Sequence, residues 1–369
     1  MVVLRRLLFL AAVGCLVGAC SGSSTSSAKQ GVANSESSTS TIAVATTTTV
    51  KTFPPDAFKA TDALLTQRVR SAGLSGGMLK LVRADGSVIH ETNVGSVNGS
   101  TPLSVASSTK WLTSAILMTF VDEGLAALDD PVSKWLPEFA VTQPPITIRQ
   151  LLTHTSGVRD NQCQSGAVAL AACVRTITTS PRQFPAGSAF SYGNSPFLVV
   201  GRVIEVVGGS DFATVARQRL TGPLGMNNTS WPGAPTAANS AFGVRTTVDD
   251  YGKFLDMVLH RGVGNNVRIM DEATFAEFIR NQVANYDTSR DFSVGITKIP
   301  RYALGAWPDV VNGFGETRVI SGNGGQGLYP WVDFDSETWG IVGVQDDRGA
   351  QLAVPASQVV AISAWSVMR

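Results

Sequence analysis

A serine and a lysine three residues apart are the residues of this sequence best suited to nucleophilic chemistry. The tetrad Ser107-Ser108-Thr109-Lys110 places Ser107 and Lys110 on one face of a helix. A serine hydroxyl is a weak nucleophile at neutral pH and needs a base that takes its proton. A lysine amine can be that base where burial lowers its pKa. The tetrad therefore predicts a serine hydrolase that works without histidine, with Ser107 as the nucleophile.

The segment Tyr192-Gly193-Asn194 supplies further polar groups of the right kind. A phenol can relay a proton, so Tyr192 is a second candidate for the acid–base work. Asn194 is expected to orient the substrate or to form a hydrogen bond with Lys110. The sequence leaves open which of Lys110 and Tyr192 is the general base.

The same pattern occurs by chance at residues 26–29 (SSAK), inside a low-complexity stretch. The residues that follow the tetrad at 107–110 distinguish it from such a match. The amphipathic run 111–121 follows Lys110 and ends near Gly124, which predicts a helix with a glycine stop. A serine at a helix start meets the positive end of the helix dipole. The alternative is that Ser107 or Ser108 only caps this helix and that Lys110 is a solvated first-turn residue.

Five segments of the chain carry a joint signal. Together they resemble, in the same order, the serine β-lactamase-like hydrolase family, which holds class C β-lactamases, DD-peptidases and related esterases. The resemblance covers most of residues 56–369 and implies an acyl-enzyme mechanism with no metal or organic cofactor. The segments are residues 105–110, 124–137, 146–157, 190–194 and 321–327.

The last of these segments departs from the family pattern. The family usually carries lysine or histidine where this chain has Asn323, followed here by Gly324 and Gly325. The resemblance implies an oxyanion hole formed by the backbone N–H groups of Ser107 and Gln326, which the glycines allow to approach the carbonyl. Asparagine offers a neutral amide, which favours a neutral ester or amide substrate. The alternative is a glycine-rich strand entry with no catalytic role.

A rival pattern occurs at residues 73–77 (GLSGG), which match the nucleophile elbow of α/β-hydrolases. That elbow needs a strand before its serine and a helix after it. Here residues 56–70 predict a helix and residues 78–82 a strand, which is the reverse order. His90, His154 and His260 lie in a strand-like stretch, a turn and a helix end, so we reject a triad built on Ser75.

The amino terminus predicts an exported bacterial lipoprotein. Arg5 and Arg6 precede an apolar stretch at residues 7–18, which is too short for a stable membrane span. Residues 17–20 (VGAC) fit a lipobox, so residues 1–20 are expected to be a signal peptide with lipidation of Cys20. Cys15 is a weaker candidate because it interrupts the apolar run. The alternative is an ordinary cleaved signal peptide with an incidental cysteine.

Residues 21–55 predict a flexible linker, because 17 of residues 21–52 are Ser or Thr. The remaining residues, 56–369, are expected to form the hydrolase domain, extracytoplasmic and tethered to the cell membrane. The formal net charge is +1, and no basic stripe indicates a nucleic-acid partner.

Cys163 and Cys173 are the cysteines outside the signal region. In an exported protein they are expected to form a disulfide. Two cysteines do not make a four-ligand zinc site, so we expect no metal centre.

Strand signals occupy both ends of the domain, with a hairpin at 79–94 and strands at 318–320, 328–332 and 338–344. Helical signals fill most of residues 105–270 and return at 353–368. This order predicts an α+β fold of the α/β sandwich type, with an antiparallel sheet, terminal helices and a helical subdomain at about 105–300.

The function expected from the sequence is hydrolysis of a small-molecule ester or amide through an acyl-enzyme, with an esterase-like activity. One alternative is a β-lactamase or D-alanyl-D-alanine carboxypeptidase that acts on β-lactams or cell-wall peptide. Another is a catalytically silent binding protein of the same fold, although intact Ser107, Lys110 and Tyr192 argue against it.

Overall fold

The structure is a computed structural model that describes residues 51–140, 144–160, 168–286, 301–345 and 352–369. Residues 52–369 form one compact unit, which is described here by itself. Cys20, the predicted lipidation site, lies outside the described residues. No helix among the described residues is long and apolar enough to cross a membrane.

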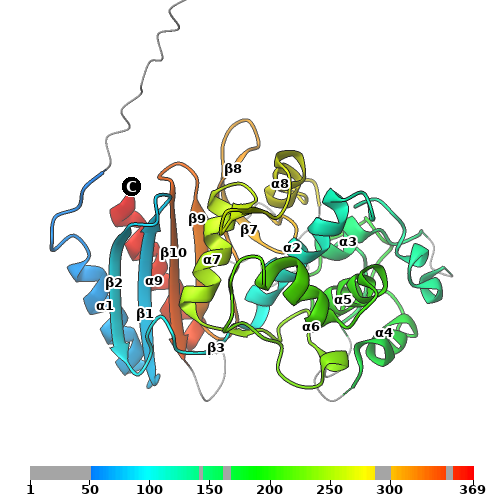
Figure 1. Ribbon diagram of the computed structural model, residues 1–369, viewed down its shortest axis with the longest axis horizontal. Coiled ribbons are helices and arrows are strands. Elements are labelled where there is room, and N and C mark those ends of the chain that lie inside the picture. Colours follow the sequence, from blue (N-terminus) through cyan, green and yellow to red (C-terminus); the bar gives the residue numbers. More distant parts are fainter. Residues whose placement is uncertain (1–50, 141–143, 161–167, 287–300, 346–351) are drawn as a thin grey trace, which may run out of the picture. The chain divides into compact units, whose positions relative to one another are not determined.

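Strands from the two ends of this unit build one antiparallel sheet in the order β2-β1-β10-β9-β8-β7 (Figure 1). The amino-terminal strand β1 pairs with the carboxy-terminal strand β10, with Leu79 opposite Val342. The strands are β1 (Gly76–Arg83), β2 (Val88–Gly95), β7 (Trp307–Val311), β8 (Thr317–Ser321), β9 (Leu328–Asp333) and β10 (Thr338–Gln345).

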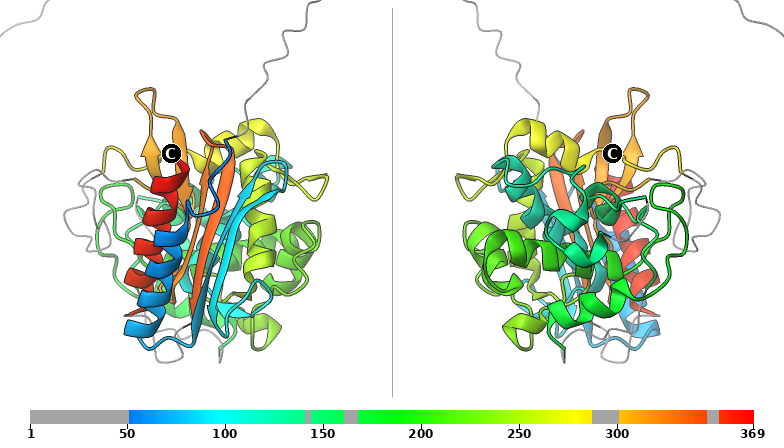
Figure 2. Two further views of the ribbon diagram at one scale, coloured as in Figure 1. Left: turned by 90° about the vertical axis from the view of Figure 1, so that its left-hand side faces the viewer. Right: turned by 90° about the vertical axis from the view of Figure 1, so that its right-hand side faces the viewer.

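Helices cover both faces of the sheet. Successive side chains of a strand point to opposite faces, so each strand contributes to the core on both sides. On β1, Leu79 packs with the core that includes α1 (Lys59–Ser71) and α9 (Ala353–Met368), whereas Met78 belongs to the core on the other face. Figure 2 shows α1 and α9 side by side against the first face. The predicted sheet with flanking terminal helices is confirmed.

The second face carries the helical part of the unit, which lies on the right in Figure 1. Its helices are α2 (Thr109–Asp122), α3 (Ile148–Leu152), α4 (Leu170–Thr178), α5 (Ser195–Gly208), α6 (Phe212–Ala216), α7 (Val248–Leu259) and α8 (Glu272–Ile279). Short two-residue strands connect them: β3 (Leu103–Ser104), β4 (Arg245–Thr246), β5 (Val263–Gly264) and β6 (Val267–Arg268).

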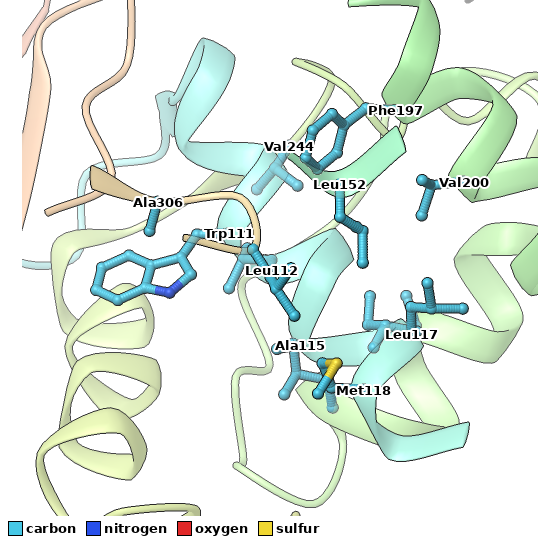
Figure 3. Close-up of a cluster of buried hydrophobic side chains, with 14 of the residues drawn as sticks. Trp111, Leu112, Ala115, Leu117, Met118, Leu152, Phe197, Val200, Val244 and Ala306 are labelled. Atoms are coloured by element: carbon cyan, nitrogen blue, oxygen red, sulfur yellow. The ribbon is translucent and has the colours of Figure 1, made fainter. Parts of the chain in front are cut away.

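Helix α2 is the central element of the helical part. Its residues from Thr109 to Phe120 are all buried, as expected for a helix that is enclosed on every side. Figure 3 shows Trp111 of α2 beside Ala306 on one side of the helix, with Leu152, Phe197 and Val200 on the other side. The buried environment of α2 extends to its first turn, where Lys110 lies.

One strand of the sheet was not predicted from the sequence. β7 contains Pro308 and Asp309, two residue types that are depleted in strands. These two residues are tolerated because β7 is an edge strand and its pairing with β8 is irregular between Pro308 and Val310. This edge strand carries Trp307, which contacts Tyr192.

Cys173 is buried in α4 and is disulfide-bonded. Its predicted partner, Cys163, lies outside the described residues. The pairing of these two cysteines therefore stays a prediction.

Candidate active site

Ser107 lies in a single 3-10 turn, Ala106–Ser108, that leads directly into α2. The residue before it, Ala106, has a positive φ of 44°, which is uncommon for a residue with a side chain and indicates local strain. The neighbouring Ser108 occupies the N-cap position of α2, but its side chain forms no capping hydrogen bond, and its hydroxyl donates to the carbonyl of Gly322 instead. Ser107 is half-buried and is held beside the first turn of α2 rather than serving as its cap.

The Lys110 amine lies in the buried centre of the site and has three neutral oxygen partners. Its Nζ is 3.1 Å from Ser107 Oγ, 2.8 Å from Asn194 Oδ1 and 3.2 Å from the Ala241 carbonyl oxygen. The side chain is completely buried, so it is not the solvated first-turn lysine of the alternative interpretation.

Burial lowers the pKa of Lys110 to about 7, while the negative charge of Asp160 acts in the opposite direction. Near neutral pH a large share of the molecules therefore carries the neutral amine. A neutral amine has two N–H groups, which can donate to Asn194 Oδ1 and to the Ala241 carbonyl. Its lone pair then faces the Ser107 hydroxyl and can take the proton.

Tyr192 and Asn194 approach Lys110 from the amino end of α5. The Tyr192 ring centre is 4.9 Å from Lys110 Nζ, and the ring stacks on Trp307 with centres 5.7 Å apart. Such a ring favours the protonated amine. The structure thus brings together Ser107, Lys110, Tyr192 and Asn194, which lie far apart in the sequence.

The turn between β8 and β9 packs against the residues on either side of Ser107. A Cβ on Gly324 would lie 2.1 Å from the Val105 carbonyl oxygen, so glycine is required for this approach. A Cβ on Gly325 would be 3.9 Å from the Ala106 Cβ. Among the described residues, nothing accepts a hydrogen bond from the Gln326 N–H. This turn therefore lies beside the nucleophile, and the Gln326 N–H is available to donate a hydrogen bond to a substrate.

Asn323 is half-buried in this turn, and its Oδ1 is buried without a hydrogen-bond partner in the part of the chain that the structure describes. Its neighbours Gly322 and Gly324 approach Trp111 and Ser108, which flank the site. No hydrogen bond joins Asn323 to Ser107 or Lys110 among the described residues. Its predicted part in substrate selection stays a prediction.

Two residues of the site were not assigned a role from the sequence. His154, which the sequence analysis placed in a turn, accepts a hydrogen bond from the Gly193 N–H on Nδ1 at 3.3 Å, and its Nε2 is 3.2 Å from the Tyr302 hydroxyl. Burial, with a smaller contribution from Lys110, holds the pKa of His154 well below its usual range. Asp160 accepts from the N–H of Asn194. No local pattern could have indicated these contacts, because they join residues more than thirty positions apart.

The remaining candidate residues lie away from this site. His90 pairs with Asp62 at 2.7 Å, and His260 ends α7. Ser75 precedes a strand and donates to the Gln345 carbonyl, which agrees with the rejection of the elbow. Among the described residues, no cluster of three or more His, Cys, Asp or Glu side chains could hold a metal ion.

Comparison with known families and proteins adds independent evidence. A family model described as Beta-lactamase matches residues 61–363. The chain is 28% identical over 272 residues to penicillin-binding protein 4 of Amycolatopsis lactamdurans, covering 64% of this chain and 70% of that protein. It is 29% identical over 196 residues to the esterase EstB of Burkholderia gladioli, covering 45% of this chain and 50% of the esterase.

A solved structure agrees with the fold described above. It is that of a candidate beta-lactamase from Bacteroides dorei, with a TM-score of 0.76 and 28% identity. The match covers 84% of this chain and 98% of the Bacteroides protein.

The burial of Lys110 predicts a pH-dependent contribution to stability. Its pKa is about 7 in the folded protein and near 10.5 in the unfolded chain. Between these values the unfolded chain binds one more proton, so the free energy of unfolding should rise with pH by about 1.4 kcal/mol per pH unit from this group. Lys110→Met should lose this contribution, which urea unfolding at several pH values between 7.5 and 9 would measure.

The exposed Lys59 supplies the matched control. Lys59→Met should leave the pH dependence of the unfolding free energy as it is in the unchanged protein. If Lys110→Met and the unchanged protein kept parallel dependences on pH, Lys110 would not be the buried neutral amine described here.

Proposed function

Because the chain belongs to the beta-lactamase family of serine hydrolases, we propose that it is an exported hydrolase that cleaves neutral esters or amides through an acyl-enzyme on Ser107. The observation that carries the proposal is the 3.1 Å contact between Ser107 Oγ and a buried lysine amine whose pKa is about 7. This arrangement supplies both a nucleophile and a base that is neutral in a large share of the molecules near neutral pH.

In the first half of the reaction, Ser107 Oγ forms a bond to the substrate carbonyl carbon while its proton passes to Lys110 Nζ. The negative charge that develops on the carbonyl oxygen would be held by the N–H groups of Ser107 and Gln326. Collapse of this intermediate breaks the bond to the leaving alcohol or amine. The leaving group takes this proton from Lys110 Nζ and departs, and the acyl-enzyme remains.

In the second half, a water molecule attacks the acyl carbon and its proton passes to the same base. The bond to Ser107 breaks, the acid product leaves, and Ser107 regains its proton. Asn194 and Ala241 keep the amine oriented throughout, because both accept hydrogen bonds from Nζ.

Asn323 supports the choice of a neutral substrate. A cation at this position could form a charge-assisted hydrogen bond with a substrate carboxylate, which is about twice as strong as a neutral one. Asparagine cannot supply that charge, and a carboxylate is costly to desolvate without it. The match to the Beta-lactamase family model, and a likeness to the D-alanyl-D-alanine-carboxypeptidase/endopeptidase AmpH of Escherichia coli, keep a β-lactamase or carboxypeptidase activity as the second candidate.

The first prediction from this proposal concerns the nucleophile. Ser107→Ala should abolish covalent labelling by a fluorophosphonate and reduce ester turnover to background, because no other hydroxyl contacts Lys110 Nζ among the described residues. Labelling is read by intact mass, and turnover with a short-chain nitrophenyl ester.

Ser75→Ala and Ser108→Ala are the controls and should remain labelled. Loss of labelling in Ser75→Ala with retention in Ser107→Ala would place the nucleophile at the elbow pattern and contradict the proposal.

A second prediction concerns selectivity. The ratio of kcat/KM for a short-chain nitrophenyl ester to that for a chromogenic cephalosporin should favour the ester in the unchanged protein. Asn323→Lys should move this ratio towards the anionic cephalosporin by about tenfold, the effect of one added charge-assisted bond.

Asn323→Gln serves as the control, because it changes length without adding charge. An unchanged protein that hydrolyses the cephalosporin efficiently and the ester poorly would favour the β-lactamase candidate instead.

We also propose that Cys20 carries a lipid that anchors the protein outside the cytoplasm, supported by the basic, apolar and VGAC segments that precede it. Residues 21–55 would then be a flexible tether. In bacteria that process lipoproteins, the full chain should fractionate with membranes and incorporate labelled palmitate. Cys20→Ser should abolish palmitate incorporation, whereas Cys15→Ser should retain it. Equal incorporation by both variants would contradict the assignment of Cys20.

A further inference from the structure

Three consecutive backbone N–H groups at the amino end of α5 donate to side chains from a distant loop. The Gly193 N–H donates to His154 Nδ1, while the Asn194 and Ser195 N–H groups both donate to Asp160 Oδ1, at 2.7 and 2.8 Å. The first N–H groups of a helix have no partner within it, so an acceptor is needed there. Asp160 provides it from thirty-four residues earlier in the chain.

The contact between this loop and α5 is close. A Cβ on Gly193 would lie 2.7 Å from Asp160 Oδ1, so the glycine between Tyr192 and Asn194 leaves room for the carboxylate. Asp160 thereby fixes the backbone of the residue whose side chain accepts from Lys110 Nζ at 2.8 Å. The connection runs from Asp160 through Asn194 and Lys110 to Ser107.

We propose that Asp160 is a positioning residue of this site: its carboxylate fixes the amino end of α5, and its charge tunes the acid–base behaviour of Lys110. The inference rests on the proposed hydrolysis at Ser107. It adds a residue that lies outside the motifs recognised in the sequence.

The charges around Lys110 explain why Asp160 matters. The amine contacts the uncharged Ser107, Asn194 and Ala241 oxygens, and the Tyr192 and Phe197 rings lie within 6 Å of it. His154 is neutral, because burial keeps its pKa low. Among the described residues, Asp160 is the carboxylate that acts on Lys110, and it favours the charged amine.

The negative charge of Asp160 raises the pKa of Lys110 relative to a site without it. Burial lowers the pKa of Lys110, and the negative charge of Asp160 limits that decrease. Without this charge the pKa of Lys110 falls further, so the neutral base is present at lower pH. The acid limb of kcat/KM against pH therefore moves to lower pH. Because Asp160 is exposed, added salt reduces the difference.

Two substitutions separate the charge of Asp160 from its hydrogen bonds. Asp160→Asn keeps an acceptor oxygen for the two N–H groups but removes the charge, so we expect the acid limb to move to lower pH and most of the plateau rate to remain. Asp160→Ala removes both, so we also expect kcat at the plateau to fall, on the order of tenfold, as Asn194 and Lys110 lose their alignment.

Asp211→Asn is the matched control, because Asp211 Oδ1 caps α6 by accepting from the Thr214 N–H at 2.9 Å. This variant should change neither the acid limb nor the plateau. All variants are measured as the full chain, with a nitrophenyl ester over a range of pH at low and high salt, and their thermal unfolding is recorded.

The outcomes distinguish this inference from the proposed function. Failure of the unchanged protein to label at Ser107 would overturn the proposed function itself. If Ser107 labels, but Asp160→Asn leaves the acid limb in place at low salt, the charge of Asp160 has no part in catalysis and the inference is wrong. A fall in thermal stability of Asp160→Ala with an unchanged plateau rate would show that Asp160 only caps α5, which also overturns it.

Discussion

Complete burial of the Lys110 amine is the constraint on which the rest of this site depends. A lysine in water is almost entirely protonated at neutral pH and cannot accept a proton, whereas the buried amine has a pKa of about 7. Such burial requires the first turn of α2 to be enclosed on every side. The sheet covers one side near Trp111, and α5 and the segment around Ala241 cover others. The sandwich of sheet and helices is therefore what makes the neutral form of this amine available to accept a proton near neutral pH.

The amine of Lys110 contacts neutral oxygen atoms, and the nearby carboxylate of Asp160 does not contact it directly. Each oxygen that contacts Nζ directly is neutral, whereas a carboxylate in any of these places would hold the lysine in its charged form. The carboxylate of Asp160 contacts the backbone of Asn194 instead, so its charge acts from a greater distance and partly through solvent. Neutral acceptors in direct contact with Nζ, together with the more distant charge of Asp160, keep the pKa of Lys110 near 7. A carboxylate in contact would raise this pKa, and loss of the Asp160 charge would lower it.

The sequence predicted the parts of the structure that depend on local spacing. Ser107 and Lys110 are joined by helical periodicity, and α9 was expected at the residues where it occurs, because an apolar helical pattern needs no distant partner to be recognised. Asp160 and His154 escaped prediction because their contacts with residues 193–195 are set by tertiary packing. β7 escaped because Pro308 and Asp309 oppose a strand, and its place at the sheet edge is a property of the assembled sheet.

Glycines hold the two halves of the site together without taking part in the chemistry. Gly193 lets Asp160 reach the end of α5, and Gly324 lets the turn between β8 and β9 reach the Val105 carbonyl oxygen. The Gly193 contact is with the side-chain carboxylate of Asp160, whereas the Gly324 contact is with the backbone of Val105 and does not involve the side chain at position 323. A substitution at position 323 therefore need not disturb the backbone contact beside Ser107. The proposed selection of substrate at position 323 is in this way physically separate from the burial that lowers the pKa of Lys110.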